Sequence, residues 1–176
     1  YSIMKAFKKL KKIIDNDDFS MNSEVIILLQ EAIEDLYNSY NIRETNEYVK
    51  VGTMQFESEI WILGENFRLF LKKNKRLKTD SVFENALWKI ILEKKYKTGR
   101  QSFVLLLSDL KISNESKKMA GCLNDIDIYG HIISVLLKLK DFSYYKEVKQ
   151  IYEEEKKGWI KQKCKKYIDS SIKSLK

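Results

Sequence analysis

Apolar residues recur at intervals of three and four along most of the chain, and this spacing predicts amphipathic helices. A short helix is expected up to Ile14, and a stronger one begins at Ser23, where apolar residues fill a wide face as far as Leu36. Another long stripe runs from Gln55 to Lys73. The polar stretch 41–53 between these two is expected to be a loop.

Shorter helical patterns follow in the second half of the chain. Ser81 and Glu84 have the spacing of a capping box, which predicts a helix start at Ser81. Gly99 is expected to separate this helix from the next. Further helices are predicted at about 115–123, 127–139, 143–154 and 158–174. Because their connectors are short, neighbouring helices are expected to pack antiparallel, giving about eight or nine helices in all.

Composition supports an all-α fold. The 176 residues include no proline and only six glycines, so the residues that favour turns between strands are scarce. Hydrophobic residues make up 44% and charged residues 33%, which is typical of a globular chain. We expect a single helical domain over residues 1–176. No apolar run approaches the ~20 residues that span a bilayer, so we expect a soluble, cytoplasmic monomer without a membrane partner.

The formal charge of +8 is unevenly distributed along the chain. The segment 24–65 carries a net charge of −7, and the segment 68–100 carries +8. Such asymmetry can steer partners, although it can also reflect solvated helix faces. The acidic segment places Glu31, Glu34 and Asp35 on the polar side of a strong helix, and we predict that they contact a partner. The alternative contact surface is basic and comprises Lys72, Lys73, Lys75 and Arg76.

Residues that carry chemistry are few. The chain has one histidine, His131, and two cysteines, Cys122 and Cys164, in no CxxC pair, so an ordinary four-ligand zinc site is excluded. We expect both cysteines to be buried and reduced. We expect no catalytic residues, no metal and no cofactor. Most of the aromatic residues, which include Trp61, Trp88 and Trp159, lie on apolar faces and are expected to be core residues.

A repeat emerges when the second helix of each C-terminal helix pair is aligned. A long or polar side chain is followed three residues later by an apolar one, and another apolar residue follows four positions after that. The aligned sets are Arg100, Phe103 and Leu107; Tyr129, Ile132 and Leu136; and Lys161, Cys164 and Ile168. This pattern, with the Asp-containing turn at 124–127, resembles the HEAT-like repeat family over residues 81–175.

The resemblance implies an α-solenoid of stacked antiparallel helix pairs that share a continuous core. It also implies that the second helices line a concave face. That face would display polar side chains for a partner, namely Gln101, His131, Ser134, Lys138, Gln162 and Lys165.

Two functions remain open at this point. Small, lysine-rich HEAT-like proteins of this size are similar to bacterial immunity proteins, which neutralise a cognate toxin by binding it. The acidic segment would complement a basic toxin such as a nuclease. The alternative is a nucleic-acid-binding HEAT-like protein that uses the basic segment 68–100. Fold alone does not choose between them.

Overall fold

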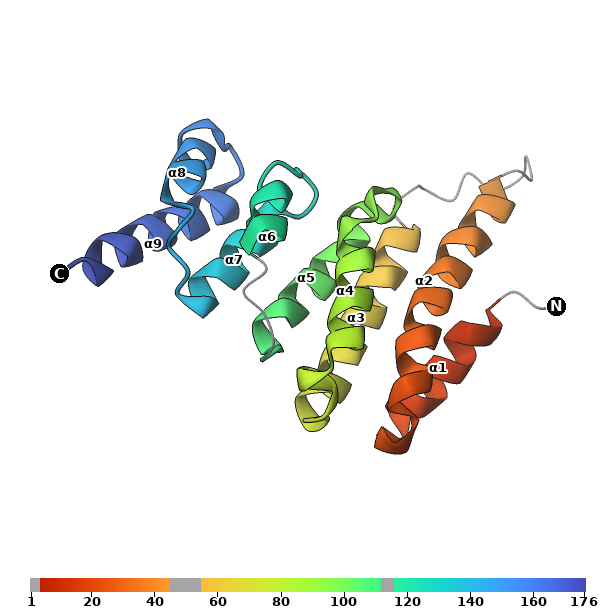
Figure 1. Cartoon of the computed structure of the whole chain (residues 1–176). Helices are drawn as coiled ribbons and strands as arrows, with labels where there is room; N and C mark the ends of the chain where they lie inside the picture. The colour runs from red at the N-terminus through yellow and green to blue at the C-terminus, as the bar shows by residue number, and fades with distance from the viewer. Residues whose placement is uncertain (1–3, 45–54, 112–115) are drawn as a thin grey trace. The chain divides into compact units, whose positions relative to one another are not determined.

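The computed structural model describes residues 4–44, 55–111 and 116–176, and this part of the chain is all-α (Figure 1). It contains nine α-helices and no strand within those ranges. The chain divides into two compact units, Tyr1–Ile112 and Ser113–Lys176. Each unit has its own buried apolar residues.

The N-terminal unit has two layers. Helix α2 contacts α4, while α3 contacts α1 and α5 (Figure 1). Short 3₁₀ segments connect or extend these helices. The elements in chain order are α1 (Lys5–Asp15), η1 (Phe19–Met21), α2 (Asn22–Glu44), α3 (Gln55–Lys73), η2 (Leu77–Thr79), α4 (Ser81–Leu92), η3 (Lys94–Arg100), α5 (Gln101–Leu106) and η4 (Leu107–Asp109).

The apolar stripes of α2 and α3 form most of this unit's core, as their spacing predicts. Every residue of the two predicted stripes is buried, because each stripe faces the other helices of the unit. They are Val25, Ile26, Leu28, Leu29, Ala32, Ile33 and Leu36 on α2, and Phe56, Ile60, Leu63, Phe67, Phe70 and Leu71 on α3. On α4 the pattern fails at Val82, which lies in the first turn and points to solvent.

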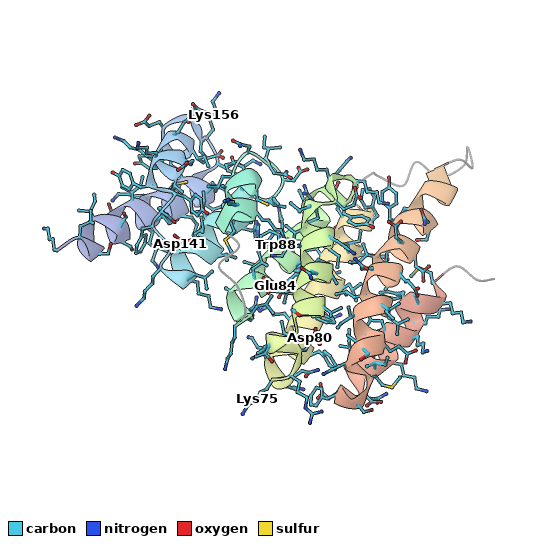
Figure 2. All side chains as sticks on the ribbon, viewed as in Figure 1. Lys75, Asp80, Glu84, Trp88, Asp141 and Lys156 are labelled. Atoms are coloured by element: carbon cyan, nitrogen blue, oxygen red, sulfur yellow. The ribbon has the colours of Figure 1, made fainter. Side chains whose placement is uncertain are left out.

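One cap and two boundaries differ from the sequence predictions. Helix α4 begins at Ser81 as predicted but ends at Leu92, and Gly99 lies within η3, so Gly99 does not form the break before α5. Helix α4 is capped by Asp80, whose Oδ1 accepts hydrogen bonds from the N–H groups of Val82 (2.8 Å) and Phe83 (3.1 Å), so the predicted capping box at Ser81 is wrong. Figure 2 labels Asp80 at this helix start. Helix α2 continues to Glu44, so the predicted loop does not include residues 41–44. The rest of that stretch, 45–53, lies outside the described residues.

Arg100 ties the end of α4 to the start of α5. Its guanidinium group is fully buried. Nη1 donates to the carbonyl of Ile91 at 2.9 Å, and Nε donates to the carbonyl of Lys97 at 2.8 Å. Lys97 has a φ of 46°, which interrupts the 3₁₀ segment, and the hydrogen bond from Arg100 holds this kink. The arginine of the aligned pattern is therefore a structural residue here.

Residues 116–176 of the C-terminal unit form four helices. They are α6 (Ser116–Cys122), α7 (Tyr129–Leu139), α8 (Tyr145–Glu154) and α9 (Gly158–Ser174). Helix α9 packs against both α7 and α8 (Figure 1). Gly130 permits a close approach, because a Cβ atom there would lie 2.6 Å from the Trp159 ring. The Tyr167 hydroxyl on α9 donates a hydrogen bond to the carbonyl of Asp141, just after α7, at 2.7 Å. Figure 2 labels Asp141.

The aligned apolar positions are buried within their own units. Phe103, Ile132 and Cys164 are all fully buried, as predicted. The later positions Leu107 and Leu136 are also buried, whereas Ile168 is only half-buried. The neighbouring Tyr167 takes the core position on α9 instead. A continuous stack of repeats over 81–175 remains a prediction.

Both cysteines are buried and unbridged, as expected. Burial, with the charge of Glu155, raises the pKa of the Cys164 thiol to about 11, so the group is a neutral thiol at neutral pH. Among the helices of the described ranges, none combines the length and the apolar character needed to cross a membrane.

Candidate protein-binding surface

The predicted acidic residues share one groove between α1 and α2. Glu31, Glu34 and Asp35 line it together with the exposed apolar side chain of Ile27, and the groove encloses about 670 Å³. The structure therefore brings these three residues together as the sequence suggests. Their charges, however, differ in how far they remain available to a partner.

Glu34 is bound within the protein. Its Oε1 accepts hydrogen bonds from Lys95 Nζ and from the Tyr96 hydroxyl, each at 2.5 Å. The lysine also lies over the ring of Tyr37, with Nζ 5.0 Å from the ring centroid. Burial alone raises the pKa of Glu34, but the hydrogen bonds from Lys95 and Tyr96 outweigh it and lower that pKa below its ordinary value. We call this group, Glu34, Tyr37, Lys95 and Tyr96, the α2–η3 clamp.

Asp35 also has a structural role. Its Oδ2 accepts hydrogen bonds from the backbone N–H groups of Ala6 (2.9 Å) and Phe7 (3.3 Å), which have no partner within the first turn of α1. A residue of α2 therefore caps the start of α1. Of the three acids, Glu31 alone is exposed. Charge reversal at Asp35 or Glu34 would damage the fold as well as any interface.

The basic residues proposed as an alternative surface lie at the end of α3 and in the connector that follows. Lys72, Lys73, Lys75 and Arg76 are all exposed, and Figure 2 labels Lys75 at this end of the unit. Lys73 pairs with Asp17, with 2.7 Å between Nζ and Oδ2. The structure records no ion pair between the other three and another described residue, so their charge faces solvent.

The remaining predicted contact residues are spread over both units. Gln101 is half-buried at the start of α5, while Lys138 is exposed on α7. Gln162 and Lys165 are exposed on α9, where Lys165 pairs with Asp169 at 2.7 Å. The structure gathers these side chains into no common recess among those it describes.

His131 is less available than predicted. Its ring is half-buried and lies edge-on to Trp159, with 5.2 Å between the ring centroids. Burial, together with the charge of Lys163, lowers its pKa to about 4. The imidazole is therefore neutral at neutral pH, and its contact with Trp159 packs the start of α9 against α7.

An apolar surface on α3 was not predicted. Trp61, Ile62 and Leu69 project from the side of α3 that faces away from the core, with exposed fractions of 39%, 52% and 59%. We call these three residues the α3 surface. Large apolar side chains gathered on one exposed helix face are typical of protein-binding sites. Trp61 and Trp159, which is also exposed, are exceptions to the expectation that most aromatic residues lie in the core, whereas Trp88 is buried.

Two hollows flank Ile62 on the α3 surface. The first, of about 360 Å³, separates Trp61 from η3 and is bordered by Glu57, Thr98 and the predicted contact residue Gln101. The second, of about 300 Å³, lies between α1 and α3, where Phe7, Ile14 and Leu63 form apolar walls. Lys11 and Asp15 form an ion pair at its edge, with 2.6 Å between Nζ and Oδ2, and Glu59 adds a carboxylate that forms no such pair with another described residue. The surface thus combines a raised apolar centre with acidic recesses on both sides.

One signal in the sequence could have revealed this surface. Residues 60–63 are four consecutive apolar residues, which is more than one face of a helix can bury. Ile60 and Leu63 take the buried positions, so Trp61 and Ile62 must face outward. Leu69 lies seven residues after Ile62 and therefore on the same side of the helix.

Comparisons of the chain with protein-family models, with curated proteins and with solved structures gave no significant match. The HEAT-like resemblance accordingly rests on the aligned residues alone. Within residues 4–44, 55–111 and 116–176, no three His, Cys, Asp or Glu side chains are placed to hold a metal ion together.

Proposed function

We propose that this chain is a protein-binding module that acts by covering the surface of a partner, and that the α3 surface is its contact. The observation that supports this most directly is the exposure of Trp61, Ile62 and Leu69 on one helix face. Tryptophan is enriched among the residues that contribute most of the binding energy at interfaces. Its contribution is largest where the surrounding contacts exclude water. The two hollows beside Ile62 offer places for the partner's side chains.

The partner that fits this surface is basic. Glu57 and Glu59 border the hollows, and each accepts one intramolecular hydrogen bond, from Thr98 and from Tyr40 respectively. A carboxylate has two oxygens and about four lone-pair sites, so each can still accept from an incoming lysine or arginine. Opposite charge at the rim of an interface chiefly raises the association rate.

A basic partner agrees with an immunity-type function. Such a protein neutralises a cognate toxin by occupying it and needs no turnover of its own. A nuclease toxin is basic because it binds nucleic acid, so it would complement the acidic recesses. We therefore propose a toxin of this charge as the partner, with Glu31 on the α1–α2 groove as an additional exposed acid.

Binding of nucleic acid is the second candidate function. It is supported by the exposed cluster Lys72, Lys75 and Arg76 beside the end of α3. Phosphate contacts by such side chains lose affinity steeply as salt rises. The cluster is small, and Lys73 is already paired with Asp17. A protein partner at the α3 surface consequently remains the first proposal.

Affinity capture from the source cell with the full chain as bait, followed by mass spectrometry, tests the proposal. The decisive variant is Trp61→Ala with Leu69→Ser, and its matched control is Val82→Ser, which changes an exposed apolar residue on α4. A captured basic protein should bind the wild type and the control equally and the double variant at least about 30-fold more weakly, since a central anchor contributes about 2 kcal/mol or more.

The purified partner then shows what binding does. Its own activity should fall in the presence of the wild-type chain and recover when the double variant replaces it. If the double variant binds as tightly as the control, the α3 surface is not the contact. If Lys72→Glu with Arg76→Glu abolishes binding and nucleic acid is recovered with the wild type, the basic cluster is the functional surface.

A further inference from the structure

A further recess lies entirely within the C-terminal unit, between α6 and α8. It encloses about 510 Å³, and we call it the α6–α8 cleft. Helix α8 forms one wall, and α6 with the turn that follows it forms the other. The lining residues that matter for binding are Leu123 and Ile126 on one side and Glu147, Ile151 and Glu154 on the other.

The two walls of the cleft differ in chemistry. On the α6 side, Leu123 is followed by Ile126, which is 72% exposed, the highest value among the large apolar residues that the structure describes before Leu175. On the α8 side, the lining residues recur at helical spacing and are mainly polar, with Glu147 and Glu154 at the ends of the row. The cleft therefore has an apolar wall facing a wall that carries Glu147 and Glu154, and Lys156 and Lys157 border it beyond the end of α8.

Not every charged group in the cleft is available to a ligand. Glu155 Oε1 accepts hydrogen bonds from the backbone N–H groups of Lys156 (2.8 Å) and Lys157 (2.7 Å), which shapes the turn before α9. Glu154 accepts one bond from Gln150 at 3.1 Å. Glu147 is exposed in the first turn of α8, at the end of the row opposite the two lysines.

We infer that the α6–α8 cleft binds an amphipathic, basic segment of a protein partner, with its apolar side against Ile126 and Leu123 and a lysine or arginine against Glu147. Charge complementarity selects this occupant. A wholly apolar segment would take water from Glu147 and Glu154 without replacing their hydrogen bonds, which is costly. An acidic segment would meet like charges at Glu147 and Glu154, and could meet opposite charge only at Lys156 and Lys157, beyond the end of α8. Glu147 and Glu154 are seven residues apart, about 10 Å along a helix, which matches about two helical turns of the occupant.

This inference goes beyond the proposed function, because it concerns different residues in a different unit and does not require the partner to be a toxin. It also predicts that the protein binds a cationic segment although its own net charge is positive. The whole chain carries +8, so a cationic segment is repelled by the molecule on average. Binding of such a segment would have to arise from a local acidic site.

Titration of the full chain with a designed peptide tests the inference. The probe is a 14-residue amphipathic helix, about two heptads, built from leucine and lysine, and the matched probe replaces each lysine by glutamate. Methyl NMR should show saturable shifts at Leu123, Ile126 and Ile151 with the lysine peptide and none with the glutamate peptide. Ile126→Ser should weaken binding about tenfold, since it removes one apolar contact that becomes buried when the peptide binds. Because Ile126 is exposed in the free protein, this change should leave the circular dichroism spectrum intact.

The electrostatic part has its own matched pair of variants. Glu147→Gln with Glu154→Gln should weaken binding and reduce its salt dependence, whereas Glu153→Gln, an exposed α8 residue outside the cleft, should leave both unchanged. Equal binding of the two peptides, shifts centred outside the cleft, or no saturable binding would overturn the inference. So would a dimer of the free chain that Ile126→Ser disrupts, because the cleft would then be occupied by a second copy. None of these results depends on the α3 surface.

Discussion

Mild acid should destabilise the protein through His131, and His131→Gln should remove this effect. The ordinary pKa of histidine is 6.5, and the folded protein lowers that of His131 to about 4 through burial and the charge of Lys163. Between these two values the unfolded chain binds a proton that the folded chain does not. Stability is therefore complete above the ordinary pKa and is lost as the pH falls toward about 4.

The size of the effect follows from the two pKa values. Between about pH 7.5 and pH 5 they correspond to a loss of about 2 kcal/mol in the free energy of unfolding. Because the ring is only partly buried, solvent screening reduces the expected loss to about 1 kcal/mol. Glu34, whose pKa is lowered, affects stability only at lower pH. Its contribution to the free energy of unfolding declines as the pH falls below the ordinary carboxyl pKa of 4.5.

Urea unfolding followed by circular dichroism at both pH values measures this loss. The quantity that isolates His131 is the difference in acid-induced loss between the wild type and His131→Gln. Glutamine keeps a polar side chain at the position and does not titrate, so the acid sensitivity should shrink by about 1 kcal/mol in the variant. An equal loss in both proteins would show that the ring is not held neutral by its surroundings.

Two further predictions concern stability. Leu136→Ala removes a fully buried side chain of α7 and should lower the free energy of unfolding by about 2–5 kcal/mol, whereas Leu139→Ala, at an exposed position of the same helix, should cost less than about 1 kcal/mol in the same denaturant titration. Asp35→Ala deletes the cap of α1 and should lower the free energy of unfolding by about 0.5–2 kcal/mol. The control is Glu31→Ala, which removes an acid of the same helix that does not cap α1. Equal losses in the two variants would contradict the capping role.

Local periodicity was sufficient to predict the helices and their buried faces. The stripes of α2 and α3 were predicted residue by residue, because burial of an amphipathic helix follows from the spacing of its apolar positions. The cap of α4 was missed by one position. Asp80 and Ser81 are both good capping residues, and only the extended backbone at Asp80, with φ −90° and ψ 114°, decides between them.

The functional residues were harder to predict because their roles depend on partners distant in sequence. Glu34 looks like a free surface acid until the fold places Lys95 beside it. Trp61 looks like a core residue until Ile60 and Leu63 take the buried positions. The acidic segment in the sequence therefore overstated how much negative charge is available to a partner. The expectation that most aromatic residues lie in the core understated the exposed apolar surface.

The α2–η3 clamp also constrains when the N-terminal unit can be completed during synthesis. Glu34 and Lys95 are separated by 61 positions in the chain. At an elongation rate of 5–20 residues per second, the ribosome takes roughly 3 to 12 s to add Lys95 after Glu34. Throughout that interval the emerged α2 lacks the clamp residues Lys95 and Tyr96, so its polar groups must remain hydrated and the unit cannot close. The α1–α2 pair with its Asp35 cap is thus made well before the contacts of Glu34 with η3 can form.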